Sequence, residues 1–193
     1  MTNQLLSEPA HAEVTSLVQQ WVEQIVVGLN LCPFARPVLQ DDALRYSICD
    51  ATDWNELRRF VLEEMSLLWD AKPSEVTTSL LIFPNSLADF EEYLDFLEMA
   101  DGLLGEAGLE GVFQFASFHP DYRFDGEPAD SRSHFTNRAP YPILHLLRED
   151  SITRAVEGSL DTEQIPVRNM ERLEGLSEEE WSNLFDKFVP TTS

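Results

Sequence analysis

Arginine and histidine side chains gather in one stretch of the sequence, between residues 119 and 148. Arginine offers a planar fork of donors that binds carboxylates and phosphates through paired hydrogen bonds, and histidine carries protons near neutral pH. This stretch therefore predicts a site for a small anion or for an oxyanion that develops during a reaction. The side chains concerned are His119, Arg123, Arg132, His134, Arg138, His145 and Arg148.

The segment from Asn137 to Pro142 contains two prolines, which restrict the backbone, so Arg138 is presented from a stiff segment. Pro142 suits the first turn of a helix, on which His145 and Arg148 would share a face. We expect these groups to converge on one anion. The candidate catalytic residues are His119 and His145, and the candidate substrate-binding residues are Arg123, Asn137, Arg138 and Arg148.

Two other interpretations of the same stretch stay open. The arginines can serve to neutralise the neighbouring acids and to hold the loop in place. His119, Asp121, His134 and His145 are also possible metal ligands, but their spacing matches no metal motif, and we expect no metal. The acids concerned are Asp121, Asp125, Glu127 and Asp130.

The two cysteines, Cys32 and Cys49, do not form a CxxC pair, and we expect both thiols to be free and slow to react. Cys32 could be a nucleophile with Asn137 and a histidine as partners. It follows a predicted helix, however, and the dipole at a helix C-terminus raises the pKa of a thiol. We therefore favour a structural role for Cys32 and a core position for Cys49.

Hydrophobic periodicity predicts alternating helices and strands in the first 118 residues. Strands separated by helices indicate parallel neighbours, and ligands of such sheets bind outside the carboxyl ends of the strands. The loop from His119 to Pro142 leaves from such an end. The predicted helices are 12–30, 53–70, 86–104 and 177–188, with Asp53, Ser86 and Ser177 as N-caps. Residues 142–148 and 150–157 are expected to form one bent helix or two short ones. The predicted strands are 44–50, 77–83 and 112–118.

The predicted fold is a single α/β domain over residues 1–193, with a core at about 12–157 and a helical C-terminal extension at about 160–189. Its sheet is small, mainly parallel and three- to four-stranded, with flanking helices. The alternative is an α+β sandwich of ferredoxin type, which needs a fourth strand that the pattern does not reveal.

The formal net charge of −22 repels phosphate backbones and anionic lipids, so we expect neither a nucleic-acid nor a membrane partner. The chain shows no signal-peptide pattern and no apolar run long enough to span a membrane, which favours a cytoplasmic protein. Nucleotide-loop, serine-hydrolase and zinc-protease motifs are also missing, and we expect no cofactor.

Three blocks carry a resemblance: Asn30 to Ala35 (NLCPFA), Phe118 to Tyr122 (FHPDY), and Thr136 to Glu149 (TNRAPYPILHLLRE). Their order and spacing resemble a bacterial family catalogued as domain of unknown function 1415, over about Ala12 to Glu157. The resemblance implies a single-domain bacterial cytoplasmic protein and adds no catalytic residue or cofactor.

The sequence thus favours a small-molecule enzyme that acts on an anionic substrate, a carboxylate or a phosphate, through His- and Arg-assisted proton or group transfer. Arg138 and Arg148 would hold the anion, and His119 or His145 would transfer the proton. The alternative is a non-catalytic module whose acidic helices bind a basic partner protein.

Overall fold

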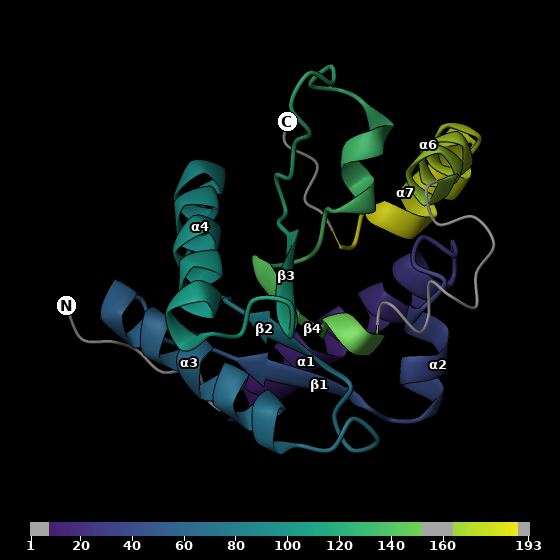
Figure 1. Cartoon of the computed structure of the whole chain (residues 1–193). Helices are drawn as coiled ribbons and strands as arrows, with labels where there is room; N and C mark the ends of the chain where they lie inside the picture. The colour runs from purple at the N-terminus through teal and green to yellow at the C-terminus, as the bar shows by residue number, and fades with distance from the viewer. Residues whose placement is uncertain (1–7, 152–163, 189–193) are drawn as a thin grey trace.

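A four-stranded sheet with helices on both faces forms the centre of the computed structural model, which describes residues 8–151 and 164–188 (Figure 1). The strands are β1 (Leu44–Ile48), β2 (Thr78–Ile82), β3 (Phe113–Phe118) and β4 (Ile143–Arg148). Their order in the sheet is β1-β2-β4-β3. No helix in the described ranges has the length and apolar character needed to cross a membrane.

The three strands predicted from the sequence are confirmed, and all three run in the same direction. β1 pairs with β2 in parallel, whereas β4 runs antiparallel to both of its neighbours, β2 and β3. The α/β class and the four-stranded sheet are therefore as predicted, but two of the three strand pairings are antiparallel, so the sheet is mixed rather than mainly parallel.

The helix predicted for Pro142 to Arg148 is wrong, because this segment is strand β4. Its side chains alternate between the two faces of the sheet: Leu144 and Leu146 belong to the core on one face, and Ile143 belongs to the core on the other. Backbone hydrogen bonds with two flanking strands favour the extended form over a short helix. The other predicted short helix, at 150–157, lies almost entirely outside the described residues.

Helices α3 (Trp54–Asp70) and α4 (Phe90–Ala107) cover one face of the sheet. Asp53 caps α3 as predicted, by accepting hydrogen bonds from the backbone N–H groups of Asn55 and Glu56. The predicted cap of α4, Ser86, is wrong, since Asp89 accepts from the N–H of Glu92 instead. Gly108 ends α4 at φ 68°, a conformation that glycine adopts without strain.

The opposite face is covered from both ends of the chain. Helix α1 (Glu8–Trp21) continues into a π-helix, η1 (Val22–Val27), and the short α2 (Ala35–Gln40) follows. Helices α6 (Ile165–Glu174) and α7 (Glu178–Phe185) add Leu173 and Phe185 to the same core, in which both are almost fully buried. The predicted Ser177–Glu180 capping box at the start of α7 is present.

Tyr93 joins the two strands next to the long loop. Its hydroxyl donates to the carbonyl of Ile143 on β4 (2.8 Å) and accepts from the N–H of Phe118 on β3 (3.1 Å). The side chain is fully buried, and desolvation raises the pKa of the phenol, so it remains a neutral donor. The hydroxyl thus satisfies two backbone groups where β3 and β4 diverge into the loop.

Replacing Tyr93 with Phe should lower the free energy of unfolding by about 1–3 kcal/mol, because two buried backbone groups lose their partner. Urea denaturation measures this change. Tyr46→Phe is the matched control, since in the described part of the chain the Tyr46 hydroxyl has no hydrogen bond to lose. Equal effects of the two substitutions would contradict the bridging role of Tyr93.

Candidate functional site

The carboxyl ends of β1, β2 and β3 lie at one edge of the sheet, and β4 begins there, because it runs the opposite way. The segment from His119 to Pro142 connects β3 to β4 at this edge. It contains a 3-10 helix, η2 (Arg132–Thr136), and is held to the body by hydrogen bonds described below. The edge chosen from the sequence is therefore the one on which this loop lies.

His119 is fully buried, and both of its ring nitrogens are used. Nδ1 accepts the backbone N–H of Asp121 (3.0 Å), so Nε2 carries the proton and donates to the carbonyl of Leu87 (3.0 Å). Desolvation lowers the pKa of this imidazole. His119 therefore joins the loop to the segment after β2 as a neutral group, and it has no free nitrogen for proton transfer.

His134 repeats this arrangement inside the loop. It too is fully buried; its Nδ1 accepts the N–H of Phe124 (3.1 Å), and its Nε2 donates to the carbonyl of Pro128 (2.8 Å). Asn137 adds a third link, since its side-chain amide donates to the carbonyl of Ser117 on β3 (3.0 Å). The sequence hypothesis assigned Asn137 to substrate binding, but in this structure its side chain holds the loop against the sheet.

Arg138, which the sequence assigns to substrate binding, has a guanidinium that is only partly occupied by hydrogen bonds within the protein. Its Nε donates to the carbonyl of Tyr122 (3.2 Å), and its Cζ lies 4.3 Å from the centre of the Phe135 ring. Nη1 and Nη2 have no hydrogen-bond partner among the described residues. Burial, together with the positive charge of Arg123, lowers the pKa of Arg138, whereas the charge of Asp121 acts in the opposite direction. The charge of Arg123 thus acts on Arg138, and we call these two residues the arginine pair.

His145 and Arg148 do not join this group, because they lie on a strand and not on a helix. Three positions apart on β4, they point to opposite faces of the sheet. His145 is in the middle of the strand, where its Nε2 is 2.8 Å from Thr78 Oγ1 and burial lowers its pKa to about 4. Arg148 is at the far edge and donates through Nη2 to the carbonyls of Leu68 and Ala71, where α3 ends.

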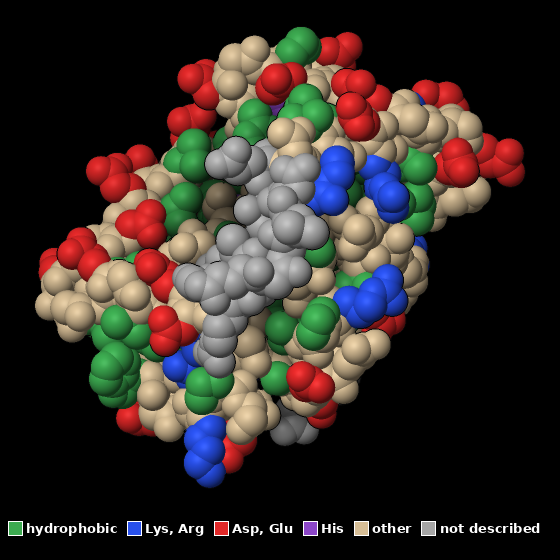
Figure 2. Space-filling view, turned by 45° about the vertical axis from the view of Figure 1, so that its right-hand side comes forward, with side chains coloured by type: hydrophobic (Ala, Val, Ile, Leu, Met, Phe, Trp, Pro, Cys, Tyr) green, Lys and Arg blue, Asp and Glu red, His purple; other side chains and the backbone are tan. Residues whose placement is uncertain are grey.

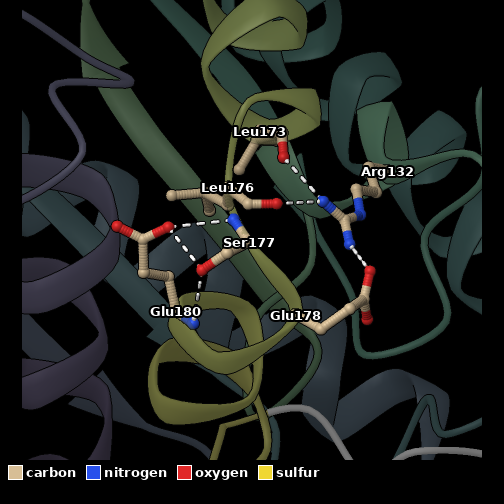
Figure 3. Close-up of polar contacts among 6 residues, drawn as sticks. All are labelled: Arg132, Leu173, Leu176, Ser177, Glu178 and Glu180. Carbon is tan, nitrogen blue, oxygen red and sulfur yellow. Dashed lines mark hydrogen bonds and ion pairs between the residues drawn. The ribbon is translucent and has the colours of Figure 1, made fainter.

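Arg132 connects the loop to the C-terminal helices, which the sequence hypothesis did not anticipate (Figure 3). Its Nη1 donates to the carbonyl of Leu176 (2.7 Å) and, at 3.4 Å, to that of Leu173, at the end of α6. Its Nη2 forms an ion pair with Glu178, and its Cζ lies 4.4 Å from the centre of the Trp181 ring. One guanidinium thus holds the turn between α6 and α7 against η2.

Phe135 is shared by the arginine pair and the C-terminal helices. Arg138 lies over its ring, and the rings of Trp181 and Phe185 pack against it with centroids 4.6 and 5.1 Å away. In Figure 1, η2 lies beside α6 and α7. The position of Arg138 therefore depends on how α7 packs as well as on the loop.

The sequence hypothesis also missed an acid–imidazole pair. His11, on α1, lies with Nε2 2.7 Å from Asp50 Oδ2, just beyond the carboxyl end of β1. Trp21, ten residues along the same helix, donates its indole N–H to the carbonyl of Arg138 (3.1 Å). Ten helical residues span about 15 Å, so His11 and Trp21 lie near opposite ends of α1. The signal available from the sequence was the position of Asp50 at a predicted strand end.

The thiols are free in this structure, as expected. Burial raises the pKa of Cys49 to about 11 and also raises that of Cys32. Cys32 precedes α2, and the backbone N–H groups of Phe34 and Ala35 partly oppose the effect of burial on its pKa. In residues 8–151 and 164–188, no three His, Cys, Asp or Glu side chains come together in a group that could hold a metal ion.

Basic side chains are few on this molecule. On the face in Figure 2, Lys and Arg form small separate groups, while Asp and Glu are spread around the rim of the view. Several arginines are bound to backbone carbonyls: Arg132 and Arg148 as described, and Arg172 to Leu29 (2.9 Å).

A family model described as "Protein of unknown function (DUF1415)" matches residues 13–183. No curated protein and no solved structure is similar to the chain.

His145 should make the protein less stable as the pH falls. The unfolded chain takes up a proton at this ring near its ordinary pKa of 6.5, whereas the folded chain does so only near 4. Stability is therefore lost between these values, by about 3 kcal/mol at most. The His145→Gln variant should not show this pH-dependent loss of stability, which urea denaturation at several pH values from 7 to 4 measures. If the difference in the free energy of unfolding between the wild type and the variant stays constant with pH, His145 is not the source of the pH dependence.

Substituting Arg132 with Gln should release α7 locally, because charge-assisted hydrogen bonds to two carbonyls and the contact with Trp181 are lost. Hydrogen–deuterium exchange of the α7 amides should accelerate about tenfold or more, which corresponds to about 1.4 kcal/mol. Arg168→Gln, on the exposed side of α6, serves as the control and should leave exchange unchanged. Unaltered exchange in the Arg132 variant would show that the contacts of Arg132 do not stabilise α7.

Proposed function

The chain belongs to the DUF1415 family, whose description names no activity. From the site alone, we propose that the protein binds and acts on a small anionic molecule, a carboxylate or a phosphate, at the arginine pair. This keeps the substrate class inferred from the sequence. Of the residues nominated there, Arg138 and Arg123 stay in the proposal. His119, Asn137, His145 and Arg148 leave it, because their polar groups are bound within the protein or lie at other places in the sheet.

The observation that carries the proposal is the state of Arg138. Its Nε is held by the Tyr122 carbonyl and its flat face rests on Phe135, so the guanidinium has a fixed orientation before any ligand arrives. Burial weakens its hydration, while Nη1 and Nη2 have no partner within the described ranges. A partly desolvated guanidinium gains more from a bidentate anion than an exposed one does.

We assign proton transfer to Asp121 and not to His119 or His145, which the sequence favoured. His119 and His145 are neutral rings, the first fully buried and the second partly buried, and both are engaged in hydrogen bonds within the protein. The negative charge of Asp121 acts on Arg138, and Asp121 directly precedes Tyr122, whose carbonyl holds this arginine. We assign the acid–base role to Asp121 in any proton transfer at this site.

Arg138→Gln should abolish binding of a simple anion. Inorganic phosphate and acetate are the probes, and the melting temperature of the wild type should rise with the concentration of at least one of them, because a ligand of the folded state stabilises it. The rise should vanish in Arg138→Gln and be reduced in Arg123→Gln. The control is Arg59→Gln, on the exposed side of α3. If Arg138→Gln shows the same rise as the wild type, the arginine pair is not the anion site.

A second candidate function is the binding of a basic partner protein, and the exposed acids of α4 favour it. Glu91, Glu92, Asp95 and Glu98 are exposed, and the molecule as a whole is strongly acidic. Such a partner would associate faster at low salt. Its binding should be insensitive to Arg138→Gln, which separates this function from the first.

A further inference from the structure

We propose that the solvent-facing side of α3, where it borders α4, binds a basic amphipathic helix of a partner protein. This inference rests on the second candidate function, the binding of a basic partner, and it names the surface and the kind of segment that binds there. It depends on three exposed apolar side chains of α3, Trp54, Leu62 and Trp69, which we call the apolar stripe, and on the acids of α4.

The members of the apolar stripe share one side of α3. Leu62 follows Trp54 by eight positions and Trp69 follows Leu62 by seven, and each of these steps is close to two whole turns of a helix. The stripe is therefore about 22 Å long, or about four turns of helix. Trp54 and Leu62 are each 38% exposed, and Trp69 is 58% exposed. A row of large exposed apolar side chains marks an interaction surface, whereas single ones are ordinary.

Two contacts place the apolar stripe beside α4. The indole N–H of Trp54 donates to Glu92 (3.2 Å), and Arg58, one turn further along α3, forms an ion pair with Glu106 (3.0 Å). Asp95 follows Glu92 by three positions and so lies on the same side of α4. The apolar stripe is thus bordered by carboxylates of the neighbouring helix.

The border carries little compensating positive charge. Helix α4 has no Lys or Arg, and its acids are all exposed: Glu91, Glu92, Asp95, Glu98, Asp101 and Glu106. The basic side chains of α3 are Arg58 and Arg59, and each of them is already in an ion pair, with Glu106 and Glu63. Lysines or arginines beside an apolar row of a partner would therefore meet carboxylates that α4 itself does not neutralise.

Charge decides which occupant this surface suits. A second copy of the chain would bring the same acids to the interface, and a net charge of −22 on each copy opposes that contact. Anionic membranes are repelled for the same reason. A helix with aliphatic residues at i, i+3, i+4 and i+7, flanked by Lys or Arg, matches both the stripe and its border. Trp54 and Trp69 are the expected anchors, because tryptophan contributes strongly to binding at interfaces.

A synthetic peptide tests the surface. The probe is a fluorescently labelled amphipathic peptide of Leu and Lys, about 18 residues long, whose binding is followed by fluorescence anisotropy. Leu62→Ser combined with Trp69→Ser should weaken its binding about tenfold or more, with a melting temperature close to that of the wild type. Val167→Ser combined with Met170→Ser is the matched control, because these exposed apolar residues lie on α6, and it should change binding less than about twofold.

Charge reversal is a second test that leaves the apolar side chains in place. Asp95→Lys should weaken binding of the Leu–Lys peptide about threefold or more and make it less sensitive to salt. Asp130→Lys is the matched control, because it makes the same change of charge at an exposed loop position away from α3 and α4. A peptide in which Glu replaces every Lys should not bind.

The outcomes separate this surface from the function on which it rests. If the Leu–Lys peptide binds but neither test variant weakens it more than its control does, a basic partner binds elsewhere and the surface is wrong. If the Glu peptide binds as well as the Lys peptide, or if the wild type dimerises through Trp69, the proposed occupant is wrong. If the wild type does not bind the Leu–Lys peptide, both the surface and the second candidate function fail.

Discussion

The loop between β3 and β4 depends on two imidazoles that are buried and neutral. His119 and His134 each accept a backbone N–H at Nδ1 and donate Nε2–H to a carbonyl, which only the neutral ring can do. A second proton would remove the acceptor of either ring, and at His119 it would place a charge among the aromatic rings of Phe90 and Tyr93. These two histidines let a long connection, whose regular structure is the short helix η2, satisfy backbone groups inside the protein.

This arrangement also determines where the arginine pair lies. His119 fixes the N–H of Asp121, the next carbonyl holds Arg138, and Arg138 lies over Phe135, which packs against α7. The site is therefore built from loop residues that are sequentially close, supported by helices from both ends of the chain. Trp21 on α1 contributes by donating to the Arg138 carbonyl. A disturbance at α7 or α1 should reach Arg138 through direct contacts.

Two of the few arginines of this protein bind backbone carbonyls at helix ends. The chain has 13 Lys and Arg against 35 Asp and Glu, yet Arg148 and Arg132 are bound to carbonyls at the ends of α3 and α6. Those carbonyls lack partners within their helices and carry partial negative charge, which suits a cation. Their guanidiniums therefore stabilise helix ends, whereas Nη1 and Nη2 of Arg138 have no hydrogen-bond partner among the described residues.

Local sequence signals determined much of the fold. Periodicity and caps located α1, α3, α7 and strands β1 to β3, and hence the edge of the sheet that carries the loop, because these features depend on residues close in sequence. They did not identify β4: Ile143 to Arg148 is a short apolar run that suits a helix or a strand, and pairing with β2 and β3 decided it.

The candidate site shows the same division between what the local sequence determines and what tertiary contacts decide. The sequence placed Arg123, Arg138 and His119 in one loop, but residue types alone could not show which nitrogens are already bonded. Only the tertiary structure showed that the His119 ring bonds to Leu87 and Asp121 and that Arg148 lies at the far edge. It also showed that Nη1 and Nη2 of Arg138 have no partner in the part of the chain that the structure describes. The physical reason is that hydrogen bonds are made between groups close in space, and the partners of these side chains come from segments that only the folded chain brings together.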